Sequence, residues 1–509
     1  MSSIRSLRPR RQGSSATARR TATAVALAVL ALGASAASAS AGKNVNIVRQ
    51  SGPPAGEVPK GTHYFTTIQA AVNASSKGDY VLIEPGVYDE SVRVESAQSG
   101  IWIRGMNRNT VILDGRHEVA NGIEIRKANN VWVENLTVRN FEFGAACPDE
   151  ECGNGIWWTG GKGSGKIGAY GWYGNYLTAY DTGLQGGYGI FAQNEEGGEF
   201  ENIYASGFAD SGFYIGACRE CAARVNKAVM EDNALGYSGS NSSGNLVIEN
   251  STFAHNLVGI APNSENPGDA PPPLDGACDS FKNTSPTPTF SSTKIKRCEV
   301  LRNNRVEQNS NLTVPVNGST GIAPWGVGIE LPGDYAVLTE KNVVTGNPND
   351  GVLGFEYPNP FPIEPNTIDF QVSGNRISEN QFANNGYNPS PELSGLPFLG
   401  DLALLSGYAE LFGGPKAESV NNCVSGNVFA DATFPTNIEG TWGCQNKTTP
   451  NPGGAEAAAI YLLTLKAEAE FIRSISPPVG QPAPPPQETM PNPCEGVPKN
   501  PLCPKGNIK

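Results

Sequence analysis

Asp232 and His255 are the two residues whose types and spacing best suit proton transfer. Their separation equals one interval of the repeat described below. One repeat apart on stacked coils, the side chains would be about 4.8 Å apart, and the carboxylate would raise the pKa of the imidazole. We expect Tyr180, two coils away, and Arg224, on a neighbouring strand, to complete a catalytic set that handles a uronate sugar. The alternative interpretation is an exposed ion pair.

Asp181 and Asp210 form a second candidate pair, in the similar settings Asp-Thr-Gly and Asp-Ser-Gly. Two carboxylates on successive coils could share a Ca²⁺ ion, the only cofactor that the sequence suggests. The alternative is that each aspartate simply stabilises a turn.

Aromatic residues crowd between positions 157 and 188. Trp157, Trp158 and Trp172 are the largest of them, and a groove lined by such rings would bind a sugar chain. The alternative is that the rings stack inside the fold, since alternation along a strand sends at most one of Trp157 and Trp158 outward.

A repeat of short apolar segments, each followed by asparagine, defines the elements that would position these residues. Met230 leads to Asn233, and Phe253 leads to Asn256 one interval later. Repeats of about 20–50 residues are typical of stacked solenoids. The predicted ladder of stacked amides comprises Asn233, Asn256, Asn309, Asn347 and Asn380.

Strands are predicted at 80–83, 91–94, 101–104 and 111–113, with turn residues between them. Before them, residues 66–72 predict a capping helix with Thr66 as N-cap. Residues 455–473 predict a second helix that covers the C-terminal edge of the sheets. The tail from Pro477 is rich in proline, which predicts an extended and mostly unpacked segment.

Residues 1–41 have the features of an export signal: six arginines, a short apolar run and Ala-x-Ala sites. We therefore expect secretion, to the medium or the cell envelope, by a general or twin-arginine route. The chain has a net charge of −12, and loss of the six arginines would make it −18. That balance disfavours nucleic acid and anionic membranes as partners, and no other run could span a bilayer. We expect a monomer.

The ten cysteines occur in close pairs, which in an exported chain predict disulfide bonds. Zinc is the alternative for Cys218 and Cys221, whose spacing suits a ligand pair. The pairs expected from proximity are Cys147/Cys152, Cys218/Cys221, Cys278/Cys298, Cys423/Cys444 and Cys494/Cys503.

Two neighbouring segments resemble the capping helix and first coil of pectin-lyase-like proteins. The first is residues 67–72, and the second is the pattern Gly78-Asp79, Val81, Ile83, Pro85-Gly86 and Tyr88. Residues 211–216 and 224–233 resemble the later coils of that superfamily. The resemblance covers about 64–444 and implies an all-β fold, a three-sided right-handed parallel β-helix. The domains expected are a signal peptide (1–41), a lead-in (42–62), the β-helix with loop insertions (63–445), a linker with a capping helix (446–476) and the tail (477–509).

The fold alone does not specify an activity. The sequence lacks the Gly-His-Gly and Asn-Thr-Asp of polygalacturonases, the Asp-Pro-His of mannuronan epimerases, the Arg-x-Pro-x-x-Arg of pectate lyases and the Gly-x-x-Asp-Phe of pectin methylesterases. Two hypotheses follow: a secreted lyase or glycoside hydrolase that acts on a polysaccharide, or a β-helix that binds glycan or belongs to the cell surface without catalysis.

Overall fold

The structure, a computed structural model, describes residues 43–143, 152–161, 167–218, 221–242, 244–263, 299–317, 320–321, 324–334, 336–356, 372, 374–405, 422–444 and 454–506. The predicted signal peptide lies outside these residues, as do Cys147, Cys278 and Cys298.

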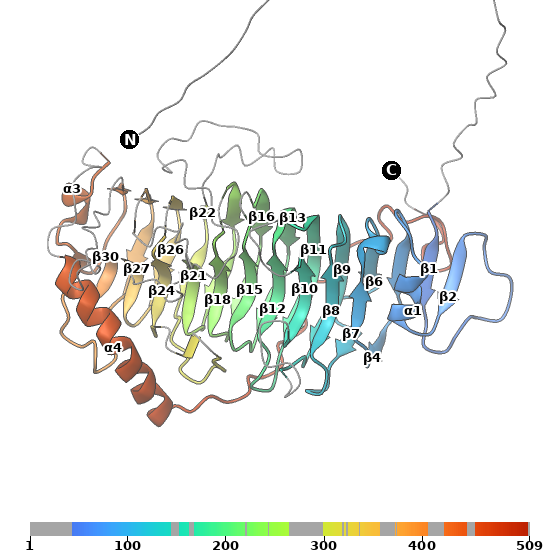
Figure 1. The fold of residues 1–509 in the computed structure, drawn as a ribbon, viewed down its shortest axis with the longest axis horizontal. Helices are drawn as coiled ribbons and strands as arrows, with labels where there is room; N and C mark the ends of the chain where they lie inside the picture. Colours follow the sequence, from blue (N-terminus) through green and yellow to red (C-terminus); the bar gives the residue numbers. More distant parts are fainter. Residues whose placement is uncertain are drawn as a thin grey trace, which may run out of the picture. The chain divides into compact units, whose positions relative to one another are not determined.

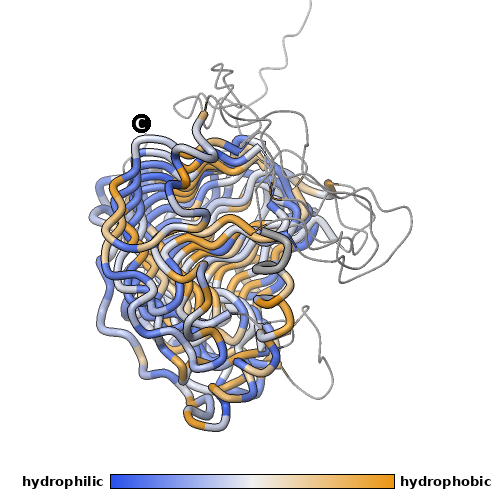
Figure 2. The backbone as a smooth tube through the Cα atoms, turned by 90° about the vertical axis from the view of Figure 1, so that its left-hand side faces the viewer, coloured by the Kyte–Doolittle hydropathy of each residue, from blue (hydrophilic) through white to orange (hydrophobic). Residues whose placement is uncertain are grey.

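The chain winds into a right-handed parallel β-helix, with the coils stacked side by side (Figure 1). Every strand pairing among the described residues is parallel, and a typical coil contributes strands to three faces. The predicted fold class is therefore confirmed. Viewed along the stack, successive coils lie in register behind one another (Figure 2).

Face 1 consists of β2 (Thr62–Phe65), β1 (Val45–Val48), β3 (Tyr80–Ile83), β6 (Trp102–Gly105), the first parts of β9 (Val131–Arg139) and β11 (Ala169–Tyr180), β13 (Glu195–Glu201), β16 (Ala223–Asn226), β19 (Leu246–Glu249), β22 (Glu299–Arg302), β25 (Val337–Glu340), β28 (Arg376–Ser378) and β31 (Cys423–Ser425). Face 2 consists of β4 (Gly86–Tyr88), β7 (Val111–Asp114), the last parts of β9 and β11, β14 (Tyr204–Ser206), β17 (Val229–Glu231), β20 (Thr252–Ala254), β23 (Arg305–Glu307), β26 (Val343–Thr345) and β29 (Gln381–Ala383).

Face 3 consists of β5 (Val92–Val94), β8 (Asn121–Arg126), β10 (Asn154–Thr159), β12 (Tyr188–Gln193), β15 (Ser211–Gly216), β18 (Leu235–Ser240), β21 (Val258–Asn263), β24 (Val327–Pro332), β27 (Asp350–Phe355), β30 (Gly400–Leu405) and β32 (Thr433–Phe434). The four strands predicted near the start agree with the structure to within one residue at each end.

The core lies between the three faces, because alternate residues of each strand point inward. On face 1 the register stacks Phe200, Val225, Ile248 and Leu301 in one buried column. The residues between them in each strand point outward, and they build the surface of the face.

Two separate asparagine ladders run along the corners of the coils. Between faces 2 and 3, the amides of Asn233, Asn256, Asn309, Asn347 and Asn385 hydrogen-bond in series at 3.0–3.1 Å. Asn380 does not belong to this ladder, contrary to the prediction. It continues a second ladder between faces 1 and 2, through Asn304, Asn342 and Asn427. The prediction missed this because both corners carry the same residue type.

Helix α1 (Ile68–Asn73) buries Ile68, Ala71 and Val72 against the first coils. Its N-cap is Thr67 and not Thr66, and the Thr67 hydroxyl accepts a hydrogen bond from the Ala70 N–H. The predicted lead-in is not separate from the sheet, because β1 lies between β2 and β3 and pairs with both.

Helix α4 (Gly454–Ile475) lies near the C-terminal end of the stack and contacts β30 (Figure 1). Its Tyr461 side chain is fully buried, with ring contacts to Phe355 and Phe398. A short helix, α3 (Ile438–Thr441), and a 3₁₀ turn at Ser96–Gln98 complete the described helical elements. None of the described helices is long and apolar enough to cross a membrane.

The C-terminal tail, residues 476–506, is packed along the coils, and we call it the strap. It leaves α4 and runs back toward the first coils (Figure 1). Gln487 hydrogen-bonds Asn109, and the guanidinium of Arg104 donates to the carbonyls of Pro493 and Glu495. Val497 is fully buried against the first strands. The predicted extended conformation agrees with the lack of helix and strand here, but the prediction of an unpacked tail is wrong.

Three of the five predicted disulfide bonds lie within the described residues: Cys218–Cys221, Cys423–Cys444 and Cys494–Cys503. The first excludes the zinc interpretation for that pair. The third closes a small loop at the end of the strap.

Cys152 is the one remaining cysteine within the described residues. It is fully buried and disulfide-bonded, but the bond is not among the three pairs above. Its predicted partner, Cys147, lies outside the described residues, as does the whole predicted pair Cys278 and Cys298. The pairing of Cys152 with Cys147 therefore stays a prediction.

Candidate functional site

Asp232 and His255 lie one coil apart at the corner between faces 2 and 3, as the repeat predicts. Each directly follows an aligned strand, since Glu231 pairs with Ala254. Both have a left-handed backbone, with φ of 56° and 59°. Asp and His tolerate that conformation better than most residues, so the turn accounts for their types. The Asp232 carboxylate also accepts a hydrogen bond from Asn311 at 2.8 Å. A catalytic role for the pair stays a prediction.

Tyr180 and Arg224 are not brought to this pair. Tyr180 pairs with Ser206, which pairs with Glu231 on the next coil. Tyr180 is therefore aligned with Glu231 and not with Asp232, so the predicted alignment was wrong by one residue. The Tyr180 side chain is buried, and its hydroxyl accepts from Arg139 at 3.0 Å. Arg224 lies on face 1, where it forms ion pairs with Glu199 and Glu249.

Asp181 and Asp210 do not form a two-carboxylate site. On the next coil, the residue beside Asp181 is Gly207, which lies close to the Asp181 carbonyl. Asp210 comes three residues after Gly207, and its N–H donates to the carbonyl of Gly187. The side chain of Asp210 accepts from the hydroxyl of the next residue, Ser211, at 2.6 Å. The two aspartates are thus at different positions of their coils, which contradicts the predicted Ca²⁺ pair.

The three tryptophans expected to bind sugar are buried. Trp158 and Trp172 are fully buried in the core, and Trp157 packs outside face 3 against Phe191. Rings without an exposed face cannot stack on a sugar. These tryptophans therefore follow the alternative interpretation, in which the rings pack within the fold. A different set of rings builds the outer surface of face 1.

Four aromatic rings stack along the outside of face 1, from Tyr80 through Trp102 and Trp132 to Tyr173. Their centroids are 4.4–5.0 Å apart. The register continues this column from Tyr173 to Glu199 on the next coil. A hollow lies at that step, which we call the face 1 pocket. It is lined by Trp132, Glu134, Tyr173, Gly174, Asn175, Glu199 and Glu201.

Three carboxylates border the face 1 pocket. Glu134 is held by Arg104 at 2.7 Å, and Glu199 by Arg224 at 3.1 Å. Burial raises the pKa of Glu134 despite its arginine, and burial together with the charge of Glu201 raises the pKa of Glu199. Glu201 accepts a hydrogen bond from Asn226 at 3.0 Å. The pocket therefore offers two carboxyls with a raised pKa, Glu134 and Glu199, beside the carboxylate of Glu201.

A second polar group lies at the corner where faces 2 and 3 meet: His117, Glu142 and Asp181, which we call the corner cluster. The His117 Nδ1 atom lies 3.3 Å from Glu142 Oε1 and 3.6 Å from Asp181 Oδ1. No role was predicted for His117 or Glu142 from the sequence. The sequence did contain a pattern that could have indicated this group. The three residues follow β7, β9 and β11, which stack as successive coils.

Burial and the neighbouring charge of Glu142 raise the pKa of Asp181 well above its usual range. Arg139, the last residue of β9, donates hydrogen bonds to Asp114 at 2.8 Å and to the Tyr180 hydroxyl at 3.0 Å. The cluster thus places two carboxyls, one of them with a raised pKa, beside one imidazole.

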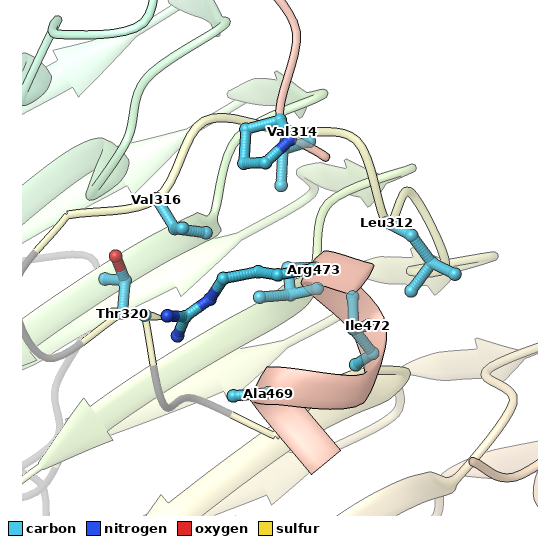
Figure 3. Close-up of a pocket in the computed structure, with 10 residues that line it drawn as sticks. Leu312, Val314, Val316, Thr320, Ala469, Ile472 and Arg473 are labelled. Carbon is cyan, nitrogen blue, oxygen red and sulfur yellow. The ribbon is translucent and has the colours of Figure 1, made fainter. Parts of the chain in front are cut away.

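A further cavity lies between the end of α4 and residues 312–316 and 320–321 (Figure 3). Leu312, Val314, Val316, Ala469 and Ile472 line it, and the Arg473 side chain extends toward Thr320 (Figure 3). Its wall is mainly apolar, which fits helix docking better than sugar binding.

No family model and no curated protein matches the chain. Among solved structures, the Azotobacter vinelandii mannuronan C-5 epimerase AlgE6 A-module is similar at 17% identity and a TM-score of 0.39, over 71% of this chain and 93% of that one. The Yersinia enterocolitica family 28 exopolygalacturonase is similar at 10% identity and 0.39, over 76% and 72%. Pectate lyase Pel9A is similar at 13% identity and 0.33, over 76% and 79%.

The topology of this chain defines the class of its fold, which is a parallel β-helix. A similarity at this level carries no information about activity.

Proposed function

We propose that this protein is a secreted carbohydrate-active β-helix protein, and that it hydrolyses an uncharged polysaccharide at the face 1 pocket. The supporting observation is the pair Glu199 and Glu201 at the end of the stacked rings. The two alternate along one strand, so both point outward, and their Cα atoms are about 6.6 Å apart. Inverting glycoside hydrolases use two carboxyls about 6.5–9.5 Å apart, a separation that flexible glutamate side chains at these two positions can adopt.

Glu199 is the proposed general acid, because burial and the charge of Glu201 raise its pKa and so favour its protonated form, against the opposing effect of Arg224. Glu201 is the proposed base that activates water. The Tyr173 ring provides apolar surface for a sugar beside them.

The charges of the pocket favour hydrolysis over lyase chemistry. A lyase must bind a uronate and neutralise its carboxylate, whereas this pocket is bordered by Glu134, Glu199 and Glu201. Arg224 and Arg104 are already engaged with two of those carboxylates. A neutral sugar meets no such repulsion.

A released-sugar assay over neutral and acidic polysaccharides tests the proposal. We expect Glu199→Gln and Glu201→Gln each to lower kcat by about 10²–10⁴-fold. Glu340→Gln is the matched control, because Glu340 lies on the outside of the same face several coils away. Circular dichroism establishes that each variant is folded.

The second candidate function is glycan binding without cleavage, which the ion pair of Glu199 with Arg224 and the hydrogen bond of Glu201 favour. Calorimetric binding with no released sugar would support it. Loss of activity in Asp232→Asn and His255→Asn, with the glutamate variants unaffected, would instead move the catalytic site to the corner between faces 2 and 3.

A further inference from the structure

One oxygen of the buried Asp181 carboxyl makes no hydrogen bond of ordinary geometry. Its side chain has no exposed area. Oδ2 accepts from the Gly186 N–H at 3.2 Å, whereas Oδ1 is buried and has no hydrogen-bond partner. Buried carboxylate oxygens without a partner are costly, so an atom of this kind indicates a missing ligand or ion.

The two other members of the corner cluster lie close to that oxygen. His117 Nδ1 lies 3.6 Å from it, and Glu142 Oε1 lies 3.3 Å from the same nitrogen. Bonds of about 2.0–2.2 Å to one tetrahedral ion place two ligand atoms about 3.4 Å apart. The two separations from His117 Nδ1 are close to that value, and all three ligand atoms lie within 4.8 Å of one another.

The three ligands are held in position before any ion binds. Glu142 Oε1 accepts from the N–H groups of Leu184 and Gln185 at 3.0 and 3.2 Å. The Nε2 atom of His117 lies 3.3 Å from the Thr182 hydroxyl, a contact that orients the ring and leaves Nδ1 directed at the carboxylates.

The residue at position 183 shows how closely the backbone approaches this site. A Cβ atom at Gly183 would lie 1.8 Å from Glu142 Oε1 and 2.8 Å from His117 Nδ1. Only glycine leaves the space between these ligand atoms open.

We propose that His117, Glu142 and Asp181 form a binding site for one divalent transition-metal ion, with Zn²⁺ as the best fit. One imidazole and two carboxylates are a ligand set that zinc accepts, whereas Ca²⁺ prefers six to eight oxygens. The His117 side chain is 39% exposed, so the ion has a route from solvent and a position for water. This site is separate from the face 1 pocket and does not depend on the function proposed for it.

Isothermal titration with Zn²⁺ tests the site, using the full chain purified without a polyhistidine tag and stripped with a chelator. We expect one equivalent to bind, and His117→Asn and Asp181→Asn each to weaken binding at least about tenfold. His255→Asn is the matched control, because it also replaces a histidine with a left-handed backbone near φ of 60°. Its affinity should equal that of the unchanged protein.

Co²⁺ provides a readout that does not depend on any variant folding. We expect the unchanged protein to give the visible absorption bands of a four-coordinate Co²⁺ site, and Zn²⁺ to displace them. Absence of saturable Zn²⁺ binding would overturn the proposal and leave the cluster as a proton-sharing group. Binding that is equally strong in folded His117→Asn and Asp181→Asn would overturn it as well.

Discussion

At the scale of the residue, the buried asparagines hold the coils in register. Asn256 is fully buried and uses both ends of its amide: Nδ2 donates to Met230 and Asn309, and Oδ1 accepts from the backbone and side chain of Asn233. Each bond links one coil to another, so the ladder satisfies a bent backbone where no strand can.

We expect Asn256→Ala to lower the free energy of unfolding by about 3 kcal/mol, because it leaves buried donors and acceptors on both neighbouring coils without partners. Urea unfolding measures the change. Asn73→Ala, at an exposed position of α1, is the control and should change stability by less than about 0.5 kcal/mol. Equal effects of the two substitutions would show that the ladder is not a major source of stability.

Tyr173 permits a second test of the face 1 pocket. Tyr173→Ala removes the last ring of the stacked series and keeps Glu199 and Glu201. We expect KM for the polysaccharide to rise about tenfold with little change in kcat, because the ring contributes binding and no proton transfer. A variant with reduced kcat and unchanged KM would contradict that assignment.

The sequence predicted residue types at the corners better than their alignment. Asp232 and His255 were placed correctly on neighbouring coils, because one regular repeat interval joins them. Tyr180, Asp181 and Asp210 were misaligned, since Phe208, and not Asp210, takes the place of the ladder asparagine in the coil that carries both residues. A slip of one residue exchanges inward and outward positions, so the tryptophans of this region could not be assigned to core or surface without the register.

At the scale of the element, α4 is docked over buried acids. Glu468 of α4 is 1% exposed and accepts a hydrogen bond from Asn349 at 3.1 Å. Burial raises its pKa to about 7, and burial together with Glu468 raises the pKa of Glu330 to about 8. The composition of the helix predicted that it would cap the stack, but it could not reveal which acids it would cover.

Because these pKa values are raised, the folded chain holds protons that the unfolded chain has released. Their contribution to stability is complete below about pH 4.5 and is lost as the pH rises through about 7 to 8. We expect Glu468→Gln to reduce the difference in unfolding free energy between pH 5 and pH 9. Glu470→Gln, exposed on the same helix, is the control. A pH dependence identical in both variants would argue against this role.

At the scale of the whole β-helix, residues 43–506, the strap joins regions that are distant in sequence. Arg108 is 3% exposed, and its guanidinium donates both to Thr178 and to the Glu488 carbonyl, 380 residues further along the chain. Contacts across that separation leave no pattern in composition. The prolines predicted an extended tail correctly, while the surface that receives it follows only from the fold.

We expect truncation after Ile475 to destabilise the first coils selectively. Arg104 and Arg108 would lose their carbonyl acceptors, and Tyr80 and Leu82 would lose the cover of Val497 and Cys503. Hydrogen exchange should quicken in β1, β3 and β6 and change little in β27. Truncation after Gly506 keeps the strap and is the control. Uniform loss of protection along all coils would contradict this expectation.

The strap also alters how such a stack can come apart. In a linear solenoid each coil touches only its neighbours, so the terminal coils fray first and at little cost. Here the C-terminal segment of the chain is bound to the first coils. The first coils therefore contact a segment from the other end of the sequence as well as their neighbouring coils. Freeing the N-terminal coil then requires the release of a segment anchored near the other end. If the two ends of the chain were pulled apart, the contacts of the strap with the first coils would therefore have to break before any coil unfolded.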